Sequence, residues 1–412
     1  MNKSEDILFL CQYFYPEYIS SATLPLDTAL ALTKEGFSVG VLCGYPKEYN
    51  LTGKVPMEEV YEGIKIKRLK YLQFRRSNFI GRLVNYFSFT FMALLHIFEL
   101  RKYKCVIVYS NPPVLPLVAA IGKKCFKIKV VFVSYDVYPE IAIKTGVLSK
   151  DSFICKMMNV VNKIIFKNID KVVVLSNEMK NFLLSHRSSI SENSIEIIPN
   201  WYEDKGDITT EKWQDNSLFS SIKKDGNFVI SYFGNMGIAQ DLDTIIKAMR
   251  ELKNDNKVQF MFAGHGVKMD YLKEIVYKED LKNVTVINFL HGQDFQDALN
   301  MSDCFLVSLA EGLTGLAVPS KTYSYMMAGK PIIAIIGEDS DIARDLKDYE
   351  AGYVVQCGES DKLVKVINEL KENECKRKQM GKNCRNVFLK KYTKERCTKH
   401  YINMIKEILE AQ

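Results

Sequence analysis

FVISYFGNMGIAQDLDTIIKAM, residues 228–249, combines an apolar run, a turn with two glycines and an amphipathic stretch. The run 228–234 predicts a buried strand, and apolar residues at helical spacing over 241–253 predict a helix. Gly234 and Gly237 lie in the turn between them, where the missing Cβ lets a ligand approach the backbone. The stretch therefore predicts one βα unit of a parallel sheet, with the turn as a candidate binding loop.

Similar units recur in two arrays along the chain. In the first array, strands are expected at 7–11, 38–43, 64–69, 105–110, 129–134 and 171–176. In the second array, they are expected at 228–234, 258–264, 284–289, 303–309 and 331–336. The polar segment 202–227 separates the arrays, and 394–411 has the apolar spacing of a helix. We therefore expect an α/β protein with Rossmann-like domains at 1–200 and 201–390 and a terminal helix within 391–412.

Composition places the chain among globular proteins of a reducing compartment. Its 412 residues suit two domains, and its ten cysteines include no CxxC pair. The first residues carry charges that interrupt any signal-peptide layout, so the cytoplasm is the expected location. Residues 1–200 hold 26 of the 56 Lys and Arg but only 17 of the 49 Asp and Glu. This basic excess predicts an acidic surface or partner for the first half.

A second candidate site lies in GLAVPSKTYSYMMAGKPII, residues 315–333. A helix is expected over 320–328, with Ser320 as its N-cap and Gly329 at the left-handed position that follows it. Its first N–H groups and Lys321 would then face an anion.

The remaining strand exits carry weaker signals. In FAGHGVKMDYL, residues 262–272, Gly264 and Gly266 repeat the glycine device, and His265 between them is either a ligand contact or a solvated loop residue. Asp241 and Asp243 form a DxD pattern, which capping of the next helix explains better than a metal.

Taken together, these motifs resemble those of a retaining glycosyltransferase of family 4 with the GT-B fold. GNMGIAQDLD, AGHG and EGLTGLAVPSKTYSYMMAGKPIIA occur in the family's order and spacing. Residues 12–44 resemble the family's opening strand, its donor-facing loop and its first helix. SYDVYPE (134–140) resembles a segment of the branch that holds O-antigen and capsule transferases, including those of N-acetyl-L-fucosamine, and IPNW (198–201) resembles the usual entry into the second domain.

The resemblance implies two Rossmann-like domains facing across a cleft, with the terminal helix crossing back to the first. It also implies a UDP-sugar donor held by the second domain, retention at the anomeric carbon, and neither a metal nor a further cofactor. Implied catalytic candidates are Asp136, Glu311 and Lys321. Implied donor contacts are Ser21, Gly234, Asn235, Gly237, Gln240, Gly264, His265, Gly266, Gly315, Leu316, Ser320, Lys321 and Ser324.

Four positions depart from the charged or titratable residues of the family pattern. The family commonly has Arg at the position of Asn235 and Lys at that of Gln240, which together clamp the donor phosphates. Ser324 stands where the family has the Glu that holds the ribose, and Tyr135 where it has a histidine. Neutral amides bind phosphate more weakly than charged groups, so another cation must compensate, and Lys321 is the candidate.

The first domain would bind the acceptor, which in this family is a lipid-linked glycan on a polyprenyl diphosphate. Its apolar run 83–98 would span roughly 24 Å as a helix, too short to cross a bilayer. Flanking cations suit peripheral docking on the inner leaflet of the cytoplasmic membrane: Lys65, Lys67, Arg68, Lys70, Arg75, Arg76 and Arg82. Residues 155–168 could share that face. The alternative is that both segments are core helices with a solvated basic rim.

The expected function is therefore transfer of an N-acetylated amino sugar from UDP to a lipid-linked acceptor in bacterial surface polysaccharide synthesis, whether capsule, O-antigen or lipopolysaccharide. Two alternatives stay open. One is a GT-B epimerase of UDP-N-acetylhexosamines, which would need no membrane face. The other is a nucleotide-sugar-binding subunit without activity. No nucleic-acid recognition motif is present.

Overall fold

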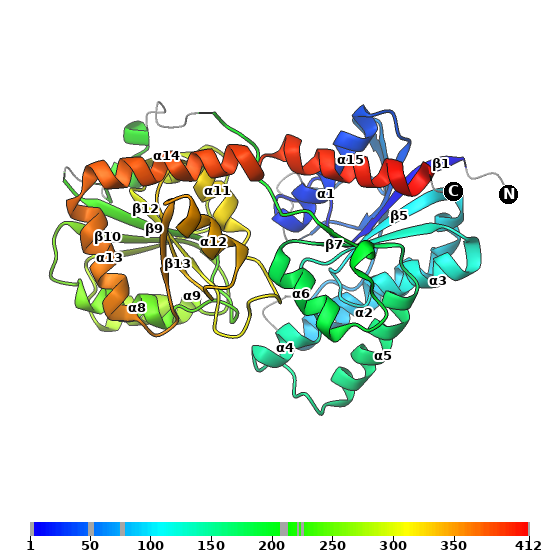
Figure 1. Cartoon of the computed structure of the whole chain (residues 1–412), viewed down its shortest axis with the longest axis horizontal. Coiled ribbons are helices and arrows are strands. Elements are labelled where there is room, and N and C mark those ends of the chain that lie inside the picture. Colours follow the sequence, from blue (N-terminus) through cyan, green and yellow to red (C-terminus); the bar gives the residue numbers. More distant parts are fainter. Residues whose placement is uncertain are drawn as a thin grey trace. The chain divides into compact units, whose positions relative to one another are not determined.

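The computed structural model describes residues 4–47, 53–74, 79–206, 213–220, 222–223 and 226–410. The chain forms two compact units (Figure 1). Unit 1 comprises residues 1–200, 315–318 and 394–412, and unit 2 comprises 201–314 and 319–393.

Unit 1 is built on a sheet that has eight strands in the described residues, in the order β3-β4-β2-β1-β5-β6-β7-β8. Neighbouring strands are parallel, except that β3 runs antiparallel to β4. The strands are β1 (Glu5–Cys11), β2 (Val39–Gly44), β3 (Glu58–Tyr61), β4 (Ile64–Leu69), β5 (Tyr103–Tyr109), β6 (Lys129–Val133), β7 (Lys171–Val174) and β8 (Ile195–Ile197).

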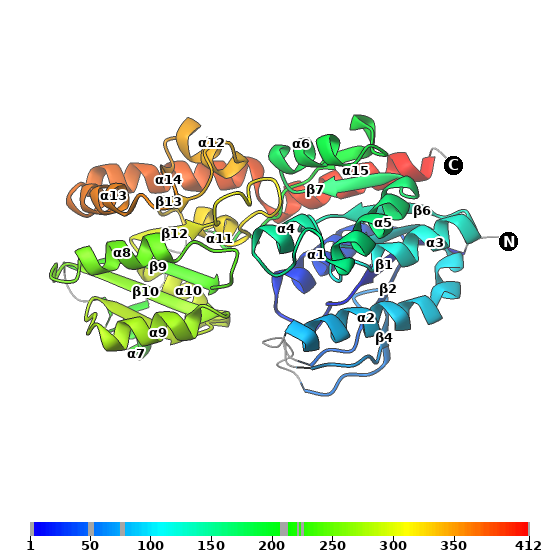
Figure 2. The ribbon, with the colours of Figure 1, turned by 90° about the horizontal axis from the view of Figure 1, so that it is seen from below.

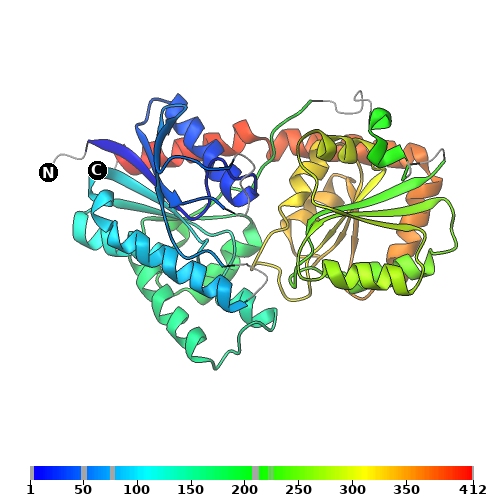
Figure 3. The same cartoon turned by 180° about the vertical axis from the view of Figure 1, so that it is seen from behind.

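Helices cover both faces of this sheet. Those of unit 1 are α1 (Ser20–Lys34), α2 (Phe79–Leu95), α3 (Pro116–Phe126), α4 (Glu140–Lys144), α5 (Phe153–Lys167), α6 (Asn177–His186) and α15 (Lys394–Glu410), with the 3₁₀ helix η1 (Ile97–Lys102). Helix α3 contacts both α2 and α5 on one face (Figure 2). Helix α15, red in Figure 3, contacts α1 on the other face. An ion pair of 2.7 Å between Lys394 and Asp27 joins α15 to α1.

Unit 2 has a parallel sheet in the order β11-β10-β9-β12-β13-β14 within the described residues. Its strands are β9 (Phe228–Asn235), β10 (Val258–His265), β11 (Val284–Asn288), β12 (Cys304–Ser308), β13 (Ile332–Ile335) and β14 (Gly352–Val355). Its helices are α7 (Ser217–Ser220), α8 (Asp243–Glu251), α9 (Met269–Lys278), α10 (Gly292–Met301), α11 (Lys321–Met327), α12 (Asp341–Asp348), α13 (Ser360–Glu372) and α14 (Glu374–Lys391). A core cluster formed by β9, β10, α8 and α9 fills one face.

Two parallel-sheet Rossmann-like units confirm the expected fold class, and each expected strand is present within a few residues. Strands β3, β8 and β14 were not expected. Glu58–Tyr61 is a partly exposed edge strand without an apolar run, and Gly352–Val355 is short and begins at glycine. In unit 2 the strand order reverses between β9 and β12, and such a switch point is where doubly wound sheets bind ligands.

The apolar run expected at 83–98 lies in α2 and η1. In the described part of the chain, no helix combines the length and the hydrophobicity that crossing a membrane requires.

Candidate functional site

The strand ends of unit 2 bring several candidate residues to one edge of its sheet. Strands β9 and β10 end level, with Gly234 beside Gly264 and Asn235 beside His265. Beyond the strands, the Met236 N–H donates to the His265 carbonyl at 2.7 Å, and the Lys268 N–H donates to the Met236 carbonyl at 2.9 Å. Loops 235–240 and 265–268 are therefore packed against each other as one substructure.

The glycines of these loops serve different purposes. A Cβ on Gly264 would lie 1.9 Å from the Gly234 carbonyl oxygen, and one on Gly266 would lie 2.4 Å from that of Met236. Glycine is therefore required at 264 and 266 by packing between the loops, before any ligand is considered. Gly234 differs, because its backbone is in the left-handed region with φ of +105° and the nearest atom to a built Cβ is Lys321 Cε at 3.8 Å.

A buried tyrosine of α11 forms hydrogen bonds with the backbone of β9. The Tyr325 hydroxyl accepts from the Phe233 N–H at 2.6 Å and donates to the Phe233 carbonyl at 3.2 Å. The Tyr325 ring also stacks on Phe305 of β12, with centroids 4.1 Å apart. Lys321 lies one turn before Tyr325, so the same face of α11 directs both side chains to β9.

This arrangement places the Lys321 ammonium beside the glycine loop. Its Nζ donates to the Asn235 carbonyl at 3.2 Å and lies 3.6 Å from the centroid of the Tyr232 ring. Desolvation lowers the pKa of Lys321 well below its ordinary value. An anion bound here would supply the counter-charge that the ammonium lacks.

The start of α11 differs from the expectation. Ser320 stands at the N-cap position directly before α11, as expected, but it has helical φ and ψ of −63° and −22° and its side chain makes no capping bond, so the expected capping by its hydroxyl is wrong. The N–H groups of Thr322 and Tyr323 donate to the carbonyls of Pro319 and Ser320 at 3.3 and 3.4 Å, which occupies part of the first turn. Gly329 is left-handed with φ of +66°, which confirms it as the residue that ends the helix.

Two of the polar side chains that stand where the family has charged residues form hydrogen bonds with the protein backbone. Gln240 Oε1 accepts from the Gly237 N–H at 2.8 Å and so closes the turn on itself. Ser324 is buried, and its hydroxyl donates to the Lys321 carbonyl at 2.9 Å. A ribose contact by Ser324 stays a prediction, and this placement does not favour it.

The two acidic candidates of unit 2 differ in their surroundings. Both carboxylate oxygens of Asp241 accept from Thr244, one from its N–H at 3.1 Å and one from its hydroxyl at 2.5 Å, which confirms that Asp241 caps α8. Glu311 is exposed on the loop after β12. Among the described residues, no group of three or more His, Cys, Asp or Glu side chains is arranged to hold a metal ion.

Other candidates belong to unit 1. Asp136 follows β6, and burial raises its pKa to about 6. Its neighbour Val137 donates its N–H to the Leu316 carbonyl at 2.8 Å, and Gly315, with φ of +80°, lies against the Glu178 backbone. These contacts hold segment 315–318 within unit 1. Ser21, near the start of α1, accepts from the Asn111 side-chain amide at 3.3 Å.

One functional candidate was missed by the sequence reasoning. Lys268 Nζ donates to the Gln240 carbonyl at 2.7 Å, at the opposite end of the glycine loop from Lys321. The signal was present as a lysine two residues after Gly266. Only the packing of the two loops shows that it reaches residue 240.

Three of the seven cations expected to face a membrane, those of β4, pair with carboxylates within unit 1. Arg68 is 1% exposed, pairs with Glu59 and donates to the carbonyls of Pro56 and Tyr15, each at 2.8 Å. The two lysines of β4 also form ion pairs: Lys65 with Glu5 at 2.5 Å, and Lys67 with Glu99 at 3.0 Å. Assigning Arg68 to a free cationic rim was wrong, because alternation along β4 turns it into the core. Arg75 and Arg76 lie outside the described residues.

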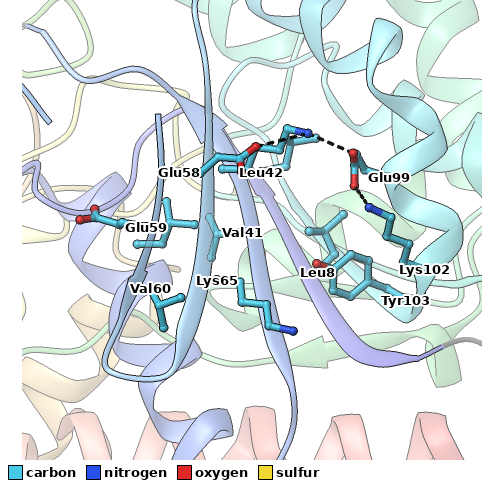
Figure 4. A pocket seen from close by; sticks show the side chains of 12 residues that line it. Leu8, Val41, Leu42, Glu58, Glu59, Val60, Lys65, Glu99, Lys102 and Tyr103 are labelled. Carbon is cyan, nitrogen blue, oxygen red and sulfur yellow. Dashed lines mark hydrogen bonds and ion pairs between the residues drawn. The ribbon is translucent and has the colours of Figure 1, made fainter. Parts of the chain in front are cut away.

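A cavity of about 460 Å³ opens on the sheet of unit 1 (Figure 4). Its floor includes Leu8 and Leu42, and its rim carries the chain of ion pairs from Glu58 through Lys67 and Glu99 to Lys102. These charged side chains are already paired with one another, so none of them offers an unpaired charge to a ligand. The loops after β9 and β10, together with Lys321 at the start of α11, are therefore the stronger candidate site.

Comparison with known proteins gives a family match, a relative and two structures of the same fold. Residues 214–387 match the family described as "Glycosyl transferases group 1". The chain is 27% identical over 273 residues to "Probable glycosyltransferase WbjE" of Pseudomonas aeruginosa, which covers 66% of this chain and 67% of that protein. It also resembles the structure of HepE from Anabaena in complex with UDP, at 15% identity and a TM-score of 0.72, covering 98% of this chain and 100% of that one. The structure of WaaG, a glycosyltransferase involved in lipopolysaccharide biosynthesis, matches at 14% identity and a TM-score of 0.70, covering 95% and 98%. At these identities the two structures show the fold, which is GT-B.

Proposed function

The family match, the relative and the fold support a group 1 glycosyltransferase, and from this premise we propose its reaction. The protein transfers a sugar, an N-acetylated amino sugar, from UDP to a lipid-linked glycan in bacterial surface polysaccharide synthesis. Configuration at the anomeric carbon is retained. The observation that carries the proposal is the position of the Lys321 ammonium. It donates a hydrogen bond to the Asn235 carbonyl and lies beside Gly234, at the strand ends of the unit 2 sheet.

The chemistry needs positive charge where the donor diphosphate leaves. When the bond between the anomeric carbon and the phosphate oxygen breaks, negative charge grows on the UDP oxygen. Lys321 stabilises that charge, most strongly where water is excluded. The acceptor hydroxyl attacks the anomeric carbon and releases its proton. Retention by attack from the face that UDP leaves lets the departing phosphate accept this proton, so no enzymic nucleophile is needed. Asp136 then orients the acceptor or donor sugar.

The first test is ligand binding followed by turnover. UDP, GDP, ADP, CMP and NAD are compared by thermal shift, where a ligand at about 100 times its Kd adds roughly 2.7 kcal/mol of stability. The proposal requires a response to UDP and transfer from a UDP-N-acetylated sugar to a polyprenyl-diphosphate-linked acceptor, with the product anomer assigned by NMR. A UDP response without transfer would favour the binding subunit, and conversion of the UDP-sugar without an acceptor would favour the epimerase.

We further propose that unit 1 docks on the anionic inner leaflet through α2 and α5. Helix α2 and the adjoining η1 expose a stripe of large apolar side chains: Ile80, Phe87, Phe91, Leu94, Leu95 and Phe98. Helix α5 exposes Phe153, Val160 and Ile164 interleaved with Lys156, Lys163 and Lys167. In the part of the chain that the structure describes, these three lysines have no carboxylate partner. Apolar insertion with free cations beside it suits anionic lipid.

Vesicle flotation tests the docking face. The triple variant Lys156→Gln, Lys163→Gln, Lys167→Gln should lose most binding to vesicles of phosphatidylglycerol and phosphatidylethanolamine. Each cation contributes about 1 kcal/mol near an anionic surface, so the loss is on the order of a hundredfold. The matched control removes three exposed lysines from unit 2: Lys247, Lys253 and Lys273. Equal flotation of the two variants would contradict the assignment.

A further inference from the structure

The glycine loop of unit 2 is held at both ends by lysines from other elements. Lys321, from α11, binds the carbonyl of its first residue, Asn235, and Lys268, from the loop before α9, binds the carbonyl of its last residue, Gln240. Both lysines are half-buried. Within the described residues, neither ammonium forms an ion pair with a carboxylate.

We propose that Lys268 supplies the second positive charge for the donor diphosphate, in partnership with Lys321. This inference rests on the proposed function and names the group that compensates for the neutral Asn235 and Gln240. The loop itself carries no cationic side chain between 234 and 240, so charge for a phosphate must come from outside it.

The chemistry of the ammonium groups allows this role. An ammonium has three N–H donors, and the bond to the Gln240 carbonyl uses one of those of Lys268, which leaves two for phosphate oxygens. The position also fits, because Lys268 Nζ lies 2.7 Å from the Gln240 carbonyl oxygen, at the end of the glycine loop opposite to the one that Lys321 contacts. A carbonyl bond fixes the ammonium without neutralising it, whereas a carboxylate partner would cancel the charge.

A purely structural role would be the competing explanation, since Lys268 also tethers loop 265–268 to loop 235–240. The two roles differ in what they predict for ligands. A phosphate contact acts only on ligands that carry phosphate. A tether that shapes the whole site acts on the nucleoside as well.

The test is calorimetric titration of the full-length protein with UDP and with uridine. Lys268→Gln removes the charge and keeps a hydrogen-bond donor, Lys268→Arg keeps the charge, and Lys273→Gln removes an exposed charge from α9 as a control. We expect Lys268→Gln to weaken UDP on the order of tenfold, as for the loss of a charge-assisted hydrogen bond, and to leave uridine within twofold. Lys268→Arg should recover most of the UDP affinity.

Two outcomes overturn the inference while the proposed function stands. One is that Lys268→Gln binds UDP as tightly as Lys273→Gln does. The other is that it weakens uridine and UDP by the same factor, which identifies Lys268 as a tether. A wild-type protein that binds no UDP at all would instead refute the proposed donor site and this inference with it.

Discussion

Removing the hydroxyl of Tyr325 tests how unit 2 positions Lys321. Among the described residues, β12 pairs with β9 only at Ile230 and Ser231, so within this part of the chain the β12 side of β9 has no strand partner beyond Ser231. The Tyr325 hydroxyl takes the place of that partner, because it accepts from the Phe233 N–H at 2.6 Å and donates to the Phe233 carbonyl at 3.2 Å. In Tyr325→Phe the ring can keep its stack on Phe305, while both backbone groups lose their partner.

The cost follows from these two groups. A buried polar group left without a hydrogen bond costs about 1–3 kcal/mol, so the pair costs about 2–6 kcal/mol of the free energy of unfolding of unit 2. A domain of this size shifts by roughly 2–4 °C per kcal/mol, which gives a lowering of Tm of about 4–24 °C. Because Lys321 lies one turn before Tyr325, UDP affinity should fall as well.

Differential scanning calorimetry of the wild type and two Tyr→Phe variants measures this. The control is Tyr277→Phe on α9, where the side chain is 87% exposed and its hydroxyl meets water. The control should melt within about 1 °C of the wild type, since exposed substitutions usually change stability by less than about 0.5 kcal/mol. If Tyr325→Phe melts with the control, the hydroxyl does not hold β9 and the account of Lys321 placement fails.

Three further outcomes are expected. Gly264→Ala should destabilise unit 2 and weaken UDP, because its Cβ would lie 1.9 Å from the Gly234 carbonyl oxygen; urea unfolding matching the wild type would contradict this. Lys321→Gln should weaken UDP by about tenfold in calorimetry, whereas Lys273→Gln should not. Burial raises the pKa of Asp136 to about 6 in the folded state. Between about pH 4 and 6, Asp136 is therefore protonated in the folded state and ionised in the unfolded state. Its contribution to the free energy of unfolding is therefore lost as pH rises through this window, and transfer should increase as the carboxylate becomes charged. Asp136→Asn should remove both dependences in urea titrations and rate profiles at pH 5 and 7.

Periodicity was enough to predict most of the fold. Apolar runs such as 228–234 and 258–264 correspond to the central strands β9 and β10, because strands buried on both faces leave a continuous apolar signature. The exposed edge strand β3 leaves no such run. Ser320 was correctly placed at the N-cap position, but its capping hydrogen bond was mispredicted because residue type alone does not give φ and ψ, and Ser320 has helical backbone angles.

Candidate-site residues were predictable where they lie at the end of a strand or the start of a helix that the sequence itself indicates, as Gly234 and Lys321 do. Lys268 was not, because its role depends on contact between loops that lie far apart in the sequence. Gly264 and Gly266 were predicted as sites of ligand approach, whereas the structure gives both a packing reason. A spacing argument cannot separate these causes, since each needs the same missing Cβ.

Charge illustrates the same limit from the other direction. The basic excess of residues 1–200 suggested where an acidic partner would bind. The lysines and the arginine of β4, however, form ion pairs with Glu5, Glu59 and Glu99. Residues 201–412 have an acidic excess, yet Lys268 and Lys321 reach the glycine loop without a carboxylate. A phosphate responds to nearby uncompensated charges, because more distant exposed ones are screened within about 10 Å. The pairing of each lysine, rather than the net charge of its half of the chain, therefore decides where an anion can bind.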